Sequence, residues 1–514
     1  MNAYINATIP FTSHDAFIIG EDGTFVDVGR KHTILNQAVD SVTDLKDATV
    51  LPGFHDSHLH VLGIGWQARM VNAEAHESIA SFLEAIAARD EPFIMGRGFH
   101  ENRIIESRML KRSDLDSVAP DTPVVVYRAC GHMCIANSAA IELATQTHGP
   151  LEESESIDLA NGLFKEDGMK AVLSLQETPD QKTLESMILT AQSDLLKNGV
   201  TSVGSDDFHV TDAPYERVID AFKSLDEQGK LKLNVFEQVN LPTLDLLDDF
   251  LSKGYAHKQF GRFTMGPLKL LADGSLGARS AYMKTPYADA DTRGILLFDA
   301  PTLQTFFERI KPYGMDFAVH GIGDGTIEAI LDAKEAVGGG KRDSIIHAQL
   351  ADHAQIARMH ALGVGAQTQP IFINSDRPII SDRLGARAEE TYLFESMRTS
   401  GVVTTLSTDA PIEATNPLNN LYVAITRKSI DHPDLPPFLP GEAMALKDAI
   451  EAYTTTPAYY TYETDKVGKI ARKQRADFIV VEGFDANDPQ SLLNTTIKQT
   501  YIHGECVYRR DSHA

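Results

Sequence analysis

Short apolar segments that end in a polar residue and are followed by a helical segment recur along this chain. Three of them end at His320, His347 and Asp409, and each is typical of a buried strand that runs into a turn. The helices expected after these strands cover residues 325–337, 353–362 and 417–428. Strands that alternate with helices of this length indicate βαβ units and a parallel sheet. We therefore expect an α/β fold with a parallel β/α barrel, in which the carboxyl ends of the strands meet at one mouth.

A fourth segment of this kind, Leu51-Pro-Gly-Phe-His-Asp-Ser-His-Leu-His60, sets His58 and His60 with one residue between them. Because side chains alternate along a strand, these two imidazoles are expected on one face and His55 on the other. Imidazole is the commonest protein ligand for zinc and similar metals, so the pair would supply half of a coordination sphere. A histidine-rich turn explains this segment alone equally well. The later strands favour a metal site, because they would bring further ligands to the same mouth.

Lys269 lies near the end of a further apolar strand that begins at Phe263. An ammonium has no lone pair and cannot bind a metal ion. Carboxylation by CO2 would convert the side chain into a carbamate, an anion that can bridge two metal ions about 3.5–4 Å apart. The spacing leaves two alternatives open, since Lys269 could instead bind substrate as a cation or pair with Asp273.

Taken in order, these motifs resemble those of the amidohydrolase superfamily, and more narrowly its family 3 branch of YtcJ-like metal-dependent hydrolases and N-substituted formamide deformylases. The resemblance covers nearly the whole chain and rests on Pro52-Gly-Phe-His-Asp-Ser-His-Leu-His60, Lys269-Leu-Leu-Ala-Asp-Gly-Ser-Leu-Gly-Ala-Arg279, His320-Gly-Ile-Gly-Asp324, His347-Ala-Gln-Leu350, Gln369-Pro370 and Ser407-Thr-Asp-Ala-Pro-Ile412. The departures are His55, where the family usually has an aliphatic residue, and Thr408, where serine is commoner. Neither departure removes a ligand.

The resemblance implies a metal-dependent (β/α)8 TIM-like barrel whose ligands are His58, His60, Lys269, His320, His347 and Asp409. His58 and His60 would bind the more buried metal ion, His320 and His347 the second. Lys269 would bridge the ions as a CO2-derived carbamate, and Asp409 would be both a ligand of the first ion and the catalytic base. The implied cofactor is a pair of divalent ions, zinc first, with manganese, iron and cobalt as alternatives.

The implied activity is hydrolysis of a carbon–nitrogen bond in a small molecule, of the non-peptide amide, N-acyl or formamide type. An ester, lactone or carbamate hydrolase on the same metal centre is the alternative, because fold does not determine the reaction. A non-catalytic regulatory relative is disfavoured, because a protein that needs no metal has no chemical reason to keep the complete ligand set.

Short β segments at both ends of the chain predict a small sheet domain, which the resemblance identifies as a composite β-sandwich of residues 1–50 and 466–514 beside a catalytic barrel of residues 51–465. Residues 70–169 interrupt the alternation after the first barrel strand and are expected to form an insertion subdomain over the active site.

Substrate contacts are expected within the insertion at His100, Arg128, His132 and Glu166. Except at His132, whose segment resembles the family's own, a pairing on the surface or within the subdomain explains each of them at least as well. Asp324 is a candidate for orienting the imidazole of His320 from behind.

Composition narrows the range of partners. The net charge of −25, from 72 acidic against 47 basic residues, disfavours nucleic acid and anionic membrane surfaces. We expect a cytoplasmic protein, because no signal peptide or apolar run of about 20 residues is present and three cysteines do not form a disulfide framework. Barrels of this size are often homodimers, although no interface is legible in the sequence.

Overall fold

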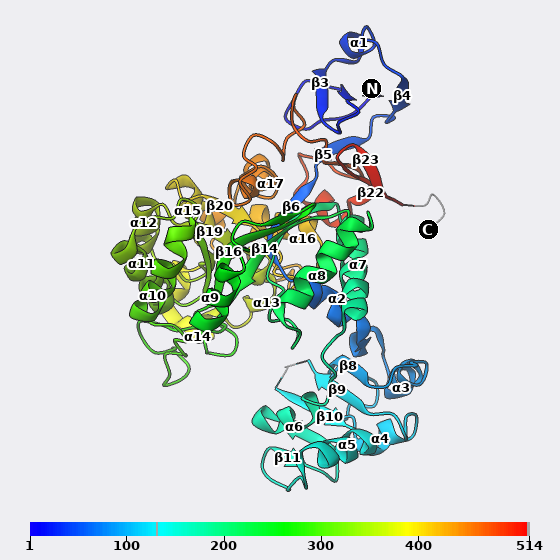
Figure 1. The fold of residues 1–514 in the computed structure, drawn as a ribbon, viewed down its shortest axis with the longest axis vertical. Helices are drawn as coiled ribbons and strands as arrows, with labels where there is room; N and C mark the ends of the chain where they lie inside the picture. The colour runs from blue at the N-terminus through cyan, green and yellow to red at the C-terminus, as the bar shows by residue number, and fades with distance from the viewer. Residues whose placement is uncertain (130–131, 511–514) are drawn as a thin grey trace. The chain divides into compact units, whose positions relative to one another are not determined.

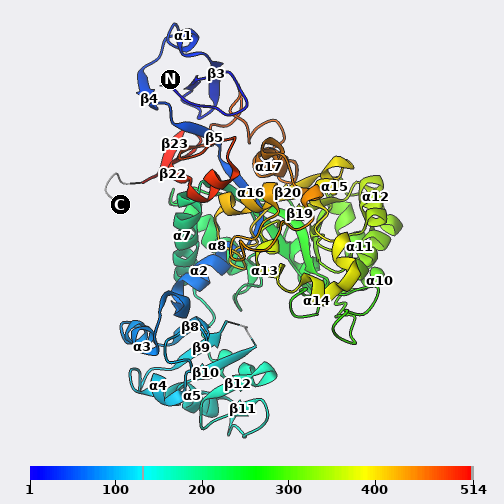
Figure 2. The same ribbon diagram turned by 180° about the vertical axis from the view of Figure 1, so that it is seen from behind.

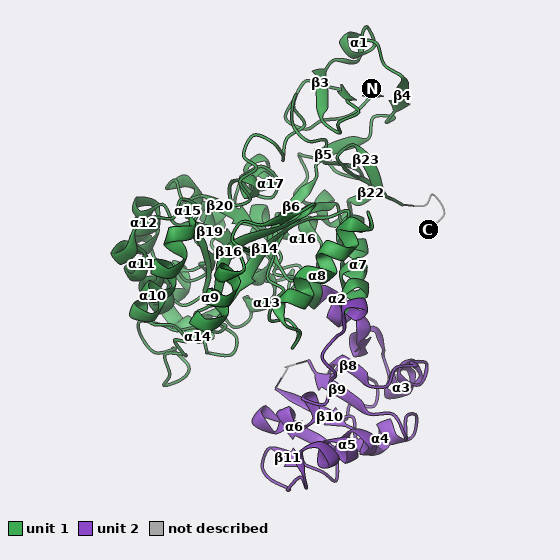
Figure 3. Ribbon diagram, viewed as in Figure 1, with its two compact units in different colours: residues 1–63, 184–514 green, residues 64–183 purple. Residues whose placement is uncertain are grey.

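The structure, a computed structural model, describes residues 1–129 and 132–510. The chain divides into two compact units (Figure 3). The barrel unit comprises residues 1–63 and 184–514, and the insertion unit comprises residues 64–183.

The barrel unit contains the parallel β/α barrel that the sequence predicts (Figures 1 and 2). Within the described residues, eight strands follow one another around it in chain order: β6 (Phe54–Leu59), β13 (Val200–Ser205), β14 (Asn234–Asn240), β16 (Phe263–Leu271), β17 (Phe317–Gly321), β18 (Ser344–His347), β19 (Gly365–Thr368) and β20 (Thr404–Leu406). Each neighbouring pair in this order is parallel. The short strand β15 (Gln259–Phe260) pairs with β16 in the antiparallel sense.

Two backbone hydrogen bonds join the first and last strands of the barrel just beyond β20. The Asp409 N–H donates to the carbonyl of His58 at 3.0 Å, and the His60 N–H donates to the carbonyl of Ala410 at 2.8 Å. We call this junction the seam. It nearly closes the barrel and brings three predicted metal ligands together through their own main chain.

A buried carboxylate reinforces the seam. Asp56 accepts hydrogen bonds from the Thr408 N–H at 3.1 Å, from the Thr408 hydroxyl at 2.7 Å and from the Tyr453 hydroxyl at 2.7 Å. Burial raises the pKa of Asp56 to about 7, and these hydrogen bonds oppose that shift. Asp56 therefore ties β6 to the loop that carries Asp409.

Helices surround the barrel strands, as the two opposite views show (Figures 1 and 2). They are α7 (Gln181–Lys197), α8 (Tyr215–Glu227), α9 (Leu244–Ser252), α10 (Ala300–Ile310), α11 (Asp324–Val337), α12 (His353–Leu362), α15 (Phe394–Thr399), α16 (Pro417–Thr426) and α17 (Leu446–Ala452). Shorter helices, α13 (Phe372–Asp376) and α14 (Ile380–Leu384), follow β19. The three helices expected after His320, His347 and Asp409 are α11, α12 and α16, so those predictions are confirmed.

Capping explains the bounds of α12. The Asp352 side chain accepts from the Gln355 N–H at its start, and the Gln355 side chain accepts in return from the Asp352 N–H. Its end is Gly363, whose φ of 66° is a conformation that glycine adopts without steric cost. Helix α12 is thus anchored at both ends directly after the strand that carries His347.

The predicted composite β-sandwich is confirmed. One four-stranded sheet has the order β3 (Phe25–Gly29), β2 (Ala16–Ile19), β1 (Asn2–Ile5) and β4 (Ser41–Asp44). The other has the order β23 (Glu505–Arg509), β22 (Thr496–Ile502), β21 (Phe478–Glu482) and β5 (Thr49–Pro52). A shared apolar core joins them, with the ring of Phe17 5.2 Å from that of Phe478. Strands from both chain ends therefore need each other to bury their apolar faces.

The insertion unit is a separate α/β layer structure. Its sheet has the order β11 (Ile157–Asp158), β12 (Leu163–Lys165), β10 (Met133–Ala136), β9 (Val124–Arg128), β8 (Ile94–Phe99) and β7 (Val71–Asn72), and its helices are α2 (Val61–Arg69, which enters the unit), α3 (Ile79–Ala87), α4 (Arg112–Asp116), α5 (Ser138–His148) and α6 (Lys170–Leu173). Alternate residues of β9 pack into two different apolar clusters, Val124 and Val126 into one and Val125 into the other. Helices thus cover both faces of this sheet, and each face has its own core.

The structure also bears on the cysteines and on the search for a membrane-spanning helix. Cys130 lies outside them, while Cys134 is buried and Cys506 is exposed, each as a free thiol. Across residues 1–129 and 132–510, the helices all fall short of the length and apolar character that a membrane crossing requires.

Asn137 is the residue on which we expect the insertion unit to depend most. Its side chain is fully buried, accepts from the N–H groups of Val124 and Ala140 at 2.9 Å, and donates to the carbonyls of Ala119 and Thr122 at 2.7 and 2.8 Å. Asn137→Ala would leave three buried main-chain groups and the partly buried carbonyl of Thr122 without this partner, so a loss of about 3 kcal/mol in the free energy of unfolding of this unit is expected.

Chemical denaturation followed by a probe in the insertion unit measures this loss. The matched control is Asn161→Ala, because Asn161 is exposed and its side chain bonds only to nearby Asp158. Equal midpoints for the two variants would contradict the prediction.

Candidate metal site

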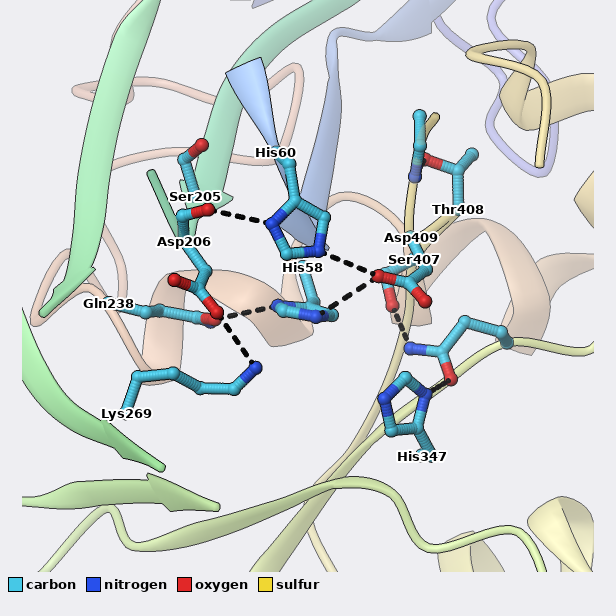
Figure 4. A network of polar contacts seen from close by, with 12 residues as sticks. His58, His60, Ser205, Asp206, Gln238, Lys269, His347, Ser407, Thr408 and Asp409 are labelled. Carbon is cyan, nitrogen blue, oxygen red and sulfur yellow. Dashed lines mark hydrogen bonds and ion pairs between the residues drawn. The ribbon is translucent and has the colours of Figure 1, made fainter. Parts of the chain in front are cut away.

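The six predicted ligands all lie at or just beyond the carboxyl ends of barrel strands; Figure 4 labels five of them, without His320. His58 and His60 belong to the end of β6, Lys269 to β16, His320 to β17, His347 to β18, and Asp409 follows β20. Three of them form a tight group: ligand atoms of His58, His347 and Asp409 lie within 4.8 Å of one another, and all three residues are buried. The structure therefore brings together residues that are up to 351 positions apart in the chain (58 to 409).

Asp409 is the centre of the group. The Nε2 atoms of His58 and His60 each lie 3.2 Å from Asp409 Oδ1 (Figure 4). Burial opposes a charge here, but the hydrogen bond from the imidazolium of His60 holds the pKa of Asp409 well below its usual range. The carboxylate is therefore ionised at neutral pH.

The tautomer of His58 follows from Gln238, a residue of β14. The Gln238 amide nitrogen donates to the Ser57 carbonyl at 3.0 Å and to the Gln367 side chain at 2.9 Å, so its oxygen is left to accept. That oxygen lies 2.7 Å from His58 Nδ1. Nδ1 therefore carries the proton, and the lone pair of Nε2 points toward Asp409.

His347 has the same arrangement with Gln369. The Gln369 amide nitrogen donates to Ser407 Oγ at 2.7 Å and to the Gln367 carbonyl at 3.1 Å, and its oxygen lies 2.7 Å from His347 Nδ1. The proton is thus on Nδ1 and the lone pair on Nε2. Burial, followed by the charge of His320, lowers the pKa of His347 well below its usual value, so the ring is neutral.

This donor set fits a metal ion. Burial and the charge of Lys269 lower the pKa of His58 to about 4, so its Nε2 and Asp409 Oδ1 are two electron-pair donors that face each other at 3.2 Å. Two lone pairs at that distance repel unless a cation lies between them. Neutral imidazoles and a carboxylate are the ligands that zinc and similar divalent ions take.

His60 differs from its neighbour. Its Nδ1 lies 2.7 Å from the carbonyl oxygen of Asp206, and its Nε2 faces Asp409, so both nitrogens act as donors. Burial would lower its pKa, but the bond to Asp409 and the charge of Asp206 raise it to about 9. In the metal-free protein His60 is therefore an imidazolium, and it must lose a proton before it can bind a metal ion.

Lys269 pairs with a residue that sequence reasoning did not single out. Its ammonium lies 3.0 Å from Asp206 Oδ2, and both side chains are buried. The pairing with Asp273 that the sequence left open is wrong, because Asp273 instead accepts from the N–H groups of Ile322, Gly323 and Tyr282.

His320 is oriented by Asp273 and not by Asp324, so that expectation is also wrong. His320 Nε2 lies 3.1 Å from the carbonyl of Gly274 and 3.2 Å from Asp273 Oδ1, which places its proton on Nε2 and leaves Nδ1 as the ligand atom. Asp324 accepts from the N–H of Lys284 instead. Asp324 is the first residue of α11, where a carboxylate favours the helix N-terminus.

The alternation expected for β6 is interrupted. Asp56 pairs with Val203 but Leu59 with Ser205, so the register shifts between them. His55 consequently lines a cavity inside the barrel together with Ser57, although it was expected on the outer face. An irregularity of this kind re-aims side chains at the end of a strand.

Two ligand positions carry backbone conformations that are unusual for residues with a side chain. His347 has a φ of 74° and Asp409 a φ of 56°. Such conformations persist where the surroundings enforce them, and they cluster at functional sites. Here the Asp409 N–H is held by the seam.

The four predicted substrate contacts lie in the insertion unit, and their role stays a prediction. Arg128 forms a two-pronged ion pair with Glu101 at 2.7 and 3.0 Å, which lowers the pKa of Glu101 to about 2. His132 lies 3.3 Å from Glu166, and both side chains are exposed. His100 Nδ1 accepts from the N–H of Asn102.

Sequence reasoning missed the residues that hold the ligands in place, namely Asp206, Gln238, Gln369 as a hydrogen-bond partner, and Asp273 as the partner of His320. A signal was present for Asp206, which directly follows an apolar strand over residues 200–205, as the other polar strand ends do. No sequence signal existed for Gln238, because the position of a glutamine in the middle of a strand does not indicate which residue it bonds to.

Comparison with known proteins identifies the family. The amidohydrolase family profile matches residues 41–508. The chain belongs to the amidohydrolase family. It is 30% identical to YtcJ of Bacillus subtilis (strain 168), over 91% of this chain and 90% of that protein. It is 26% identical to an N-substituted formamide deformylase of Arthrobacter pascens, over 91% of this chain and 90% of that enzyme.

A solved structure agrees in fold over nearly the whole length. An uncharacterised metal-dependent hydrolase from Pyrococcus furiosus superposes with a TM-score of 0.81 at 31% identity, covering 95% of this chain and all of that one (100%). The predicted family and barrel fold are therefore confirmed.

Gln369→Leu is expected to lower metal affinity about 10–100-fold, as loss of a partner behind a metal-bound histidine usually does. The leucine cannot accept from His347 Nδ1, so the ring is free to change tautomer and rotate. Competition with a chelator measures the affinity. The matched control is Gln349→Leu, since Gln349 is equally buried but bonds to Tyr392 and Asp376; a similar loss in the control would count against the assignment.

The imidazolium of His60 predicts a pH dependence for the metal-free protein. Because its pKa is raised from 6.5 to about 9 on folding, its contribution to stability is complete below pH 6.5 and is lost as the pH rises through 9. Denaturant midpoints of chelator-treated protein between these pH values test this. His60→Asn should remove that part of the slope; an unchanged slope in this variant would assign it to other groups.

Proposed function

We propose that this protein is a metal-dependent hydrolase that cleaves the carbon–nitrogen bond of a small amide of the non-peptide, N-acyl or formamide type. The observation that carries the proposal is the set of lone pairs on His58, His347 and Asp409, which converge within 4.8 Å in a buried site. The carbon–nitrogen bond is supported by the likeness to the N-substituted formamide deformylase of Arthrobacter pascens.

The residues suit two metal ions. His58, His60 and Asp409 would hold the first ion, and Nδ1 of His320 and Nε2 of His347 would belong to the second. Bound divalent ions of this kind lower the pKa of water to about 7 and polarise a carbonyl group. Zinc is the first choice for this ligand set, with manganese, iron and cobalt as alternatives.

We further propose that Lys269 is carboxylated in the active form and bridges the two ions. Its side chain is buried, bonds to Asp206, and lies at the end of the barrel that carries the predicted histidine ligands, which supports this proposal. As an ammonium it is neutralised by Asp206 at 3.0 Å. As a carbamate it would add a second anion beside Asp206, an arrangement that two divalent cations would offset.

Asp409 is the group that moves the proton. Both imidazoles contact Oδ1, so Oδ2 is the oxygen left to accept a proton from the attacking water. As the carbon–nitrogen bond breaks, the same oxygen returns the proton to the leaving nitrogen, giving a carboxylic acid and an amine. The lowered pKa of Asp409 keeps the carboxylate ionised at neutral pH, so it is in the form that can accept a proton.

Asp409→Asn is expected to lower turnover of the best substrate in a panel of formamides and N-acyl amines by about 10²–10⁴, because the amide cannot accept the proton. The control is Asp352→Asn, which removes the charge of a helix-capping residue that also pairs with Lys284 at 3.4 Å, away from the six predicted ligands. Full activity of Asp409→Asn would overturn the assignment of the base. Preferential cleavage of matched esters or lactones would replace the proposed bond with the alternative one.

Elemental analysis of the same preparations tests the metal centre. About two ions per chain are expected in the parent protein, and fewer in Lys269→Ala, because the bridging ligand is lost. If the parent protein binds one ion per chain and Lys269→Ala does not change that number, the site is mononuclear. The role of Lys269 is then the ion pair with Asp206 and not a bridge between ions.

A further inference from the structure

A second cavity lies in the barrel unit at the amino ends of the strands, the end opposite to the metal site. It is lined by residues near the starts of β6, β13, β14 and β16, together with residues 461–466, Arg475 and His503 from the C-terminal part of the chain. None of the six predicted metal ligands lines it. In TIM-like barrels the chemistry lies at the carboxyl ends, so a ligand here would not take part in the hydrolysis.

The lining of this cavity is basic, although the chain as a whole carries a net charge of −25. Arg262, Arg475 and Lys466 contribute fixed positive charges, whereas Glu463 is the single carboxylate among the lining residues that the structure describes. Burial lowers the pKa of the lining residue His55 to about 3 and also lowers that of His503, so these two rings are neutral. Such a local reversal of sign concentrates anions from solution. The cavity thus selects for negative ligands.

Arg475 is accounted for by protein partners, but Arg262 is not. Arg475 pairs with Asp477 at 2.5 Å and with Glu463 at 2.7 Å. Arg262 donates to the side-chain oxygen of Asn234 at 3.1 Å, and within the described residues no carboxylate lies within ion-pair distance of its guanidinium. Burial lowers the pKa of Arg262, and the charges of Asp477, Glu505 and Asp226, which lie beyond ion-pair distance, only partly oppose that shift.

Two neighbouring groups also have unused hydrogen-bonding capacity. His55 is 3% exposed, and among the described residues its Nδ1 finds no partner. The Ser202 oxygen accepts from Arg475 and from Asn234, each at 3.3 Å, so its proton is directed elsewhere. Buried polar atoms without partners are rare in native proteins and indicate a missing ligand or water.

We propose that this cavity is a second binding site, which takes a small oxyanion of the phosphate or dicarboxylate class. The guanidinium of Arg262 binds the anion, and the Ser202 hydroxyl and His55 Nδ1–H donate to its oxygens. Arginine suits this role because its fixed fork of N–H groups matches the oxygens of such anions. The bound anion links the barrel strands to the C-terminal segment, so it stabilises the folded barrel unit.

The proposal does not depend on the proposed function, because the two sites share no residue. Calorimetry of the metal-loaded protein with inorganic phosphate and with malonate, beside chloride at equal ionic strength, measures the binding. At least one of the two anions should bind saturably, raise the thermal midpoint, and leave amide hydrolysis unchanged.

Arg262→Gln should weaken that binding about 10–100-fold, the usual effect of losing a charge-assisted hydrogen bond. Lys447→Gln is the matched control, because Lys447 is an exposed cation on α17. Equal affinities in these two variants would place the anion elsewhere, for example at the metal site, and would overturn the proposal, as would the absence of saturable binding. If Arg262→Gln does not fold, His55→Leu is the replacement variant. It removes the Nδ1 donor and should also weaken anion binding relative to Lys447→Gln.

Discussion

The seam between the first and last barrel strands is the constraint on which the site depends. Two main-chain hydrogen bonds and the Asp56 carboxylate hold the ends of β6 and β20 together. Because His58 and Asp409 are themselves members of this junction, closing the barrel and assembling the site are one event. The entropic cost of bringing together residues that are 351 positions apart (58 to 409) is therefore met by the packing of the whole barrel and not by the ligands.

Neutral amide side chains fix the tautomers of two histidines that the folded barrel brings to the site. Gln238 faces the protonated nitrogen of His58, and Gln369 faces that of His347. The amide nitrogens of these two glutamines each donate to an oxygen of Gln367. An amide determines which nitrogen carries the proton without adding a charge to a buried site, which would be costly to desolvate. The lone pairs of the two Nε2 atoms are thus already directed into the candidate metal site in the metal-free structure.

The two ends of the barrel have opposite electrostatic character. At the carboxyl ends, Asp206, Asp273 and Asp409 surround the histidines and Lys269, an environment that suits divalent cations. At the amino ends, Arg262 and Arg475 gather around a cavity in an otherwise acidic chain. One scaffold can therefore present a cation site and an anion site whose ligands are separated by the polar interior of the barrel.

The sequence by itself determined the strand and helix pattern and the barrel, and it picked out the candidate metal ligands, because alternation of apolar segments and the polarity of strand ends are local signals. Helices α11, α12 and α16 followed from that pattern, and so did the strand ends at His320, His347 and Asp409. The tertiary structure alone decided that Lys269 pairs with Asp206, that Asp273 and not Asp324 orients His320, and that His55 lines the interior. Those contacts join residues far apart in sequence or depend on one irregularity in a strand, and no local pattern encodes either.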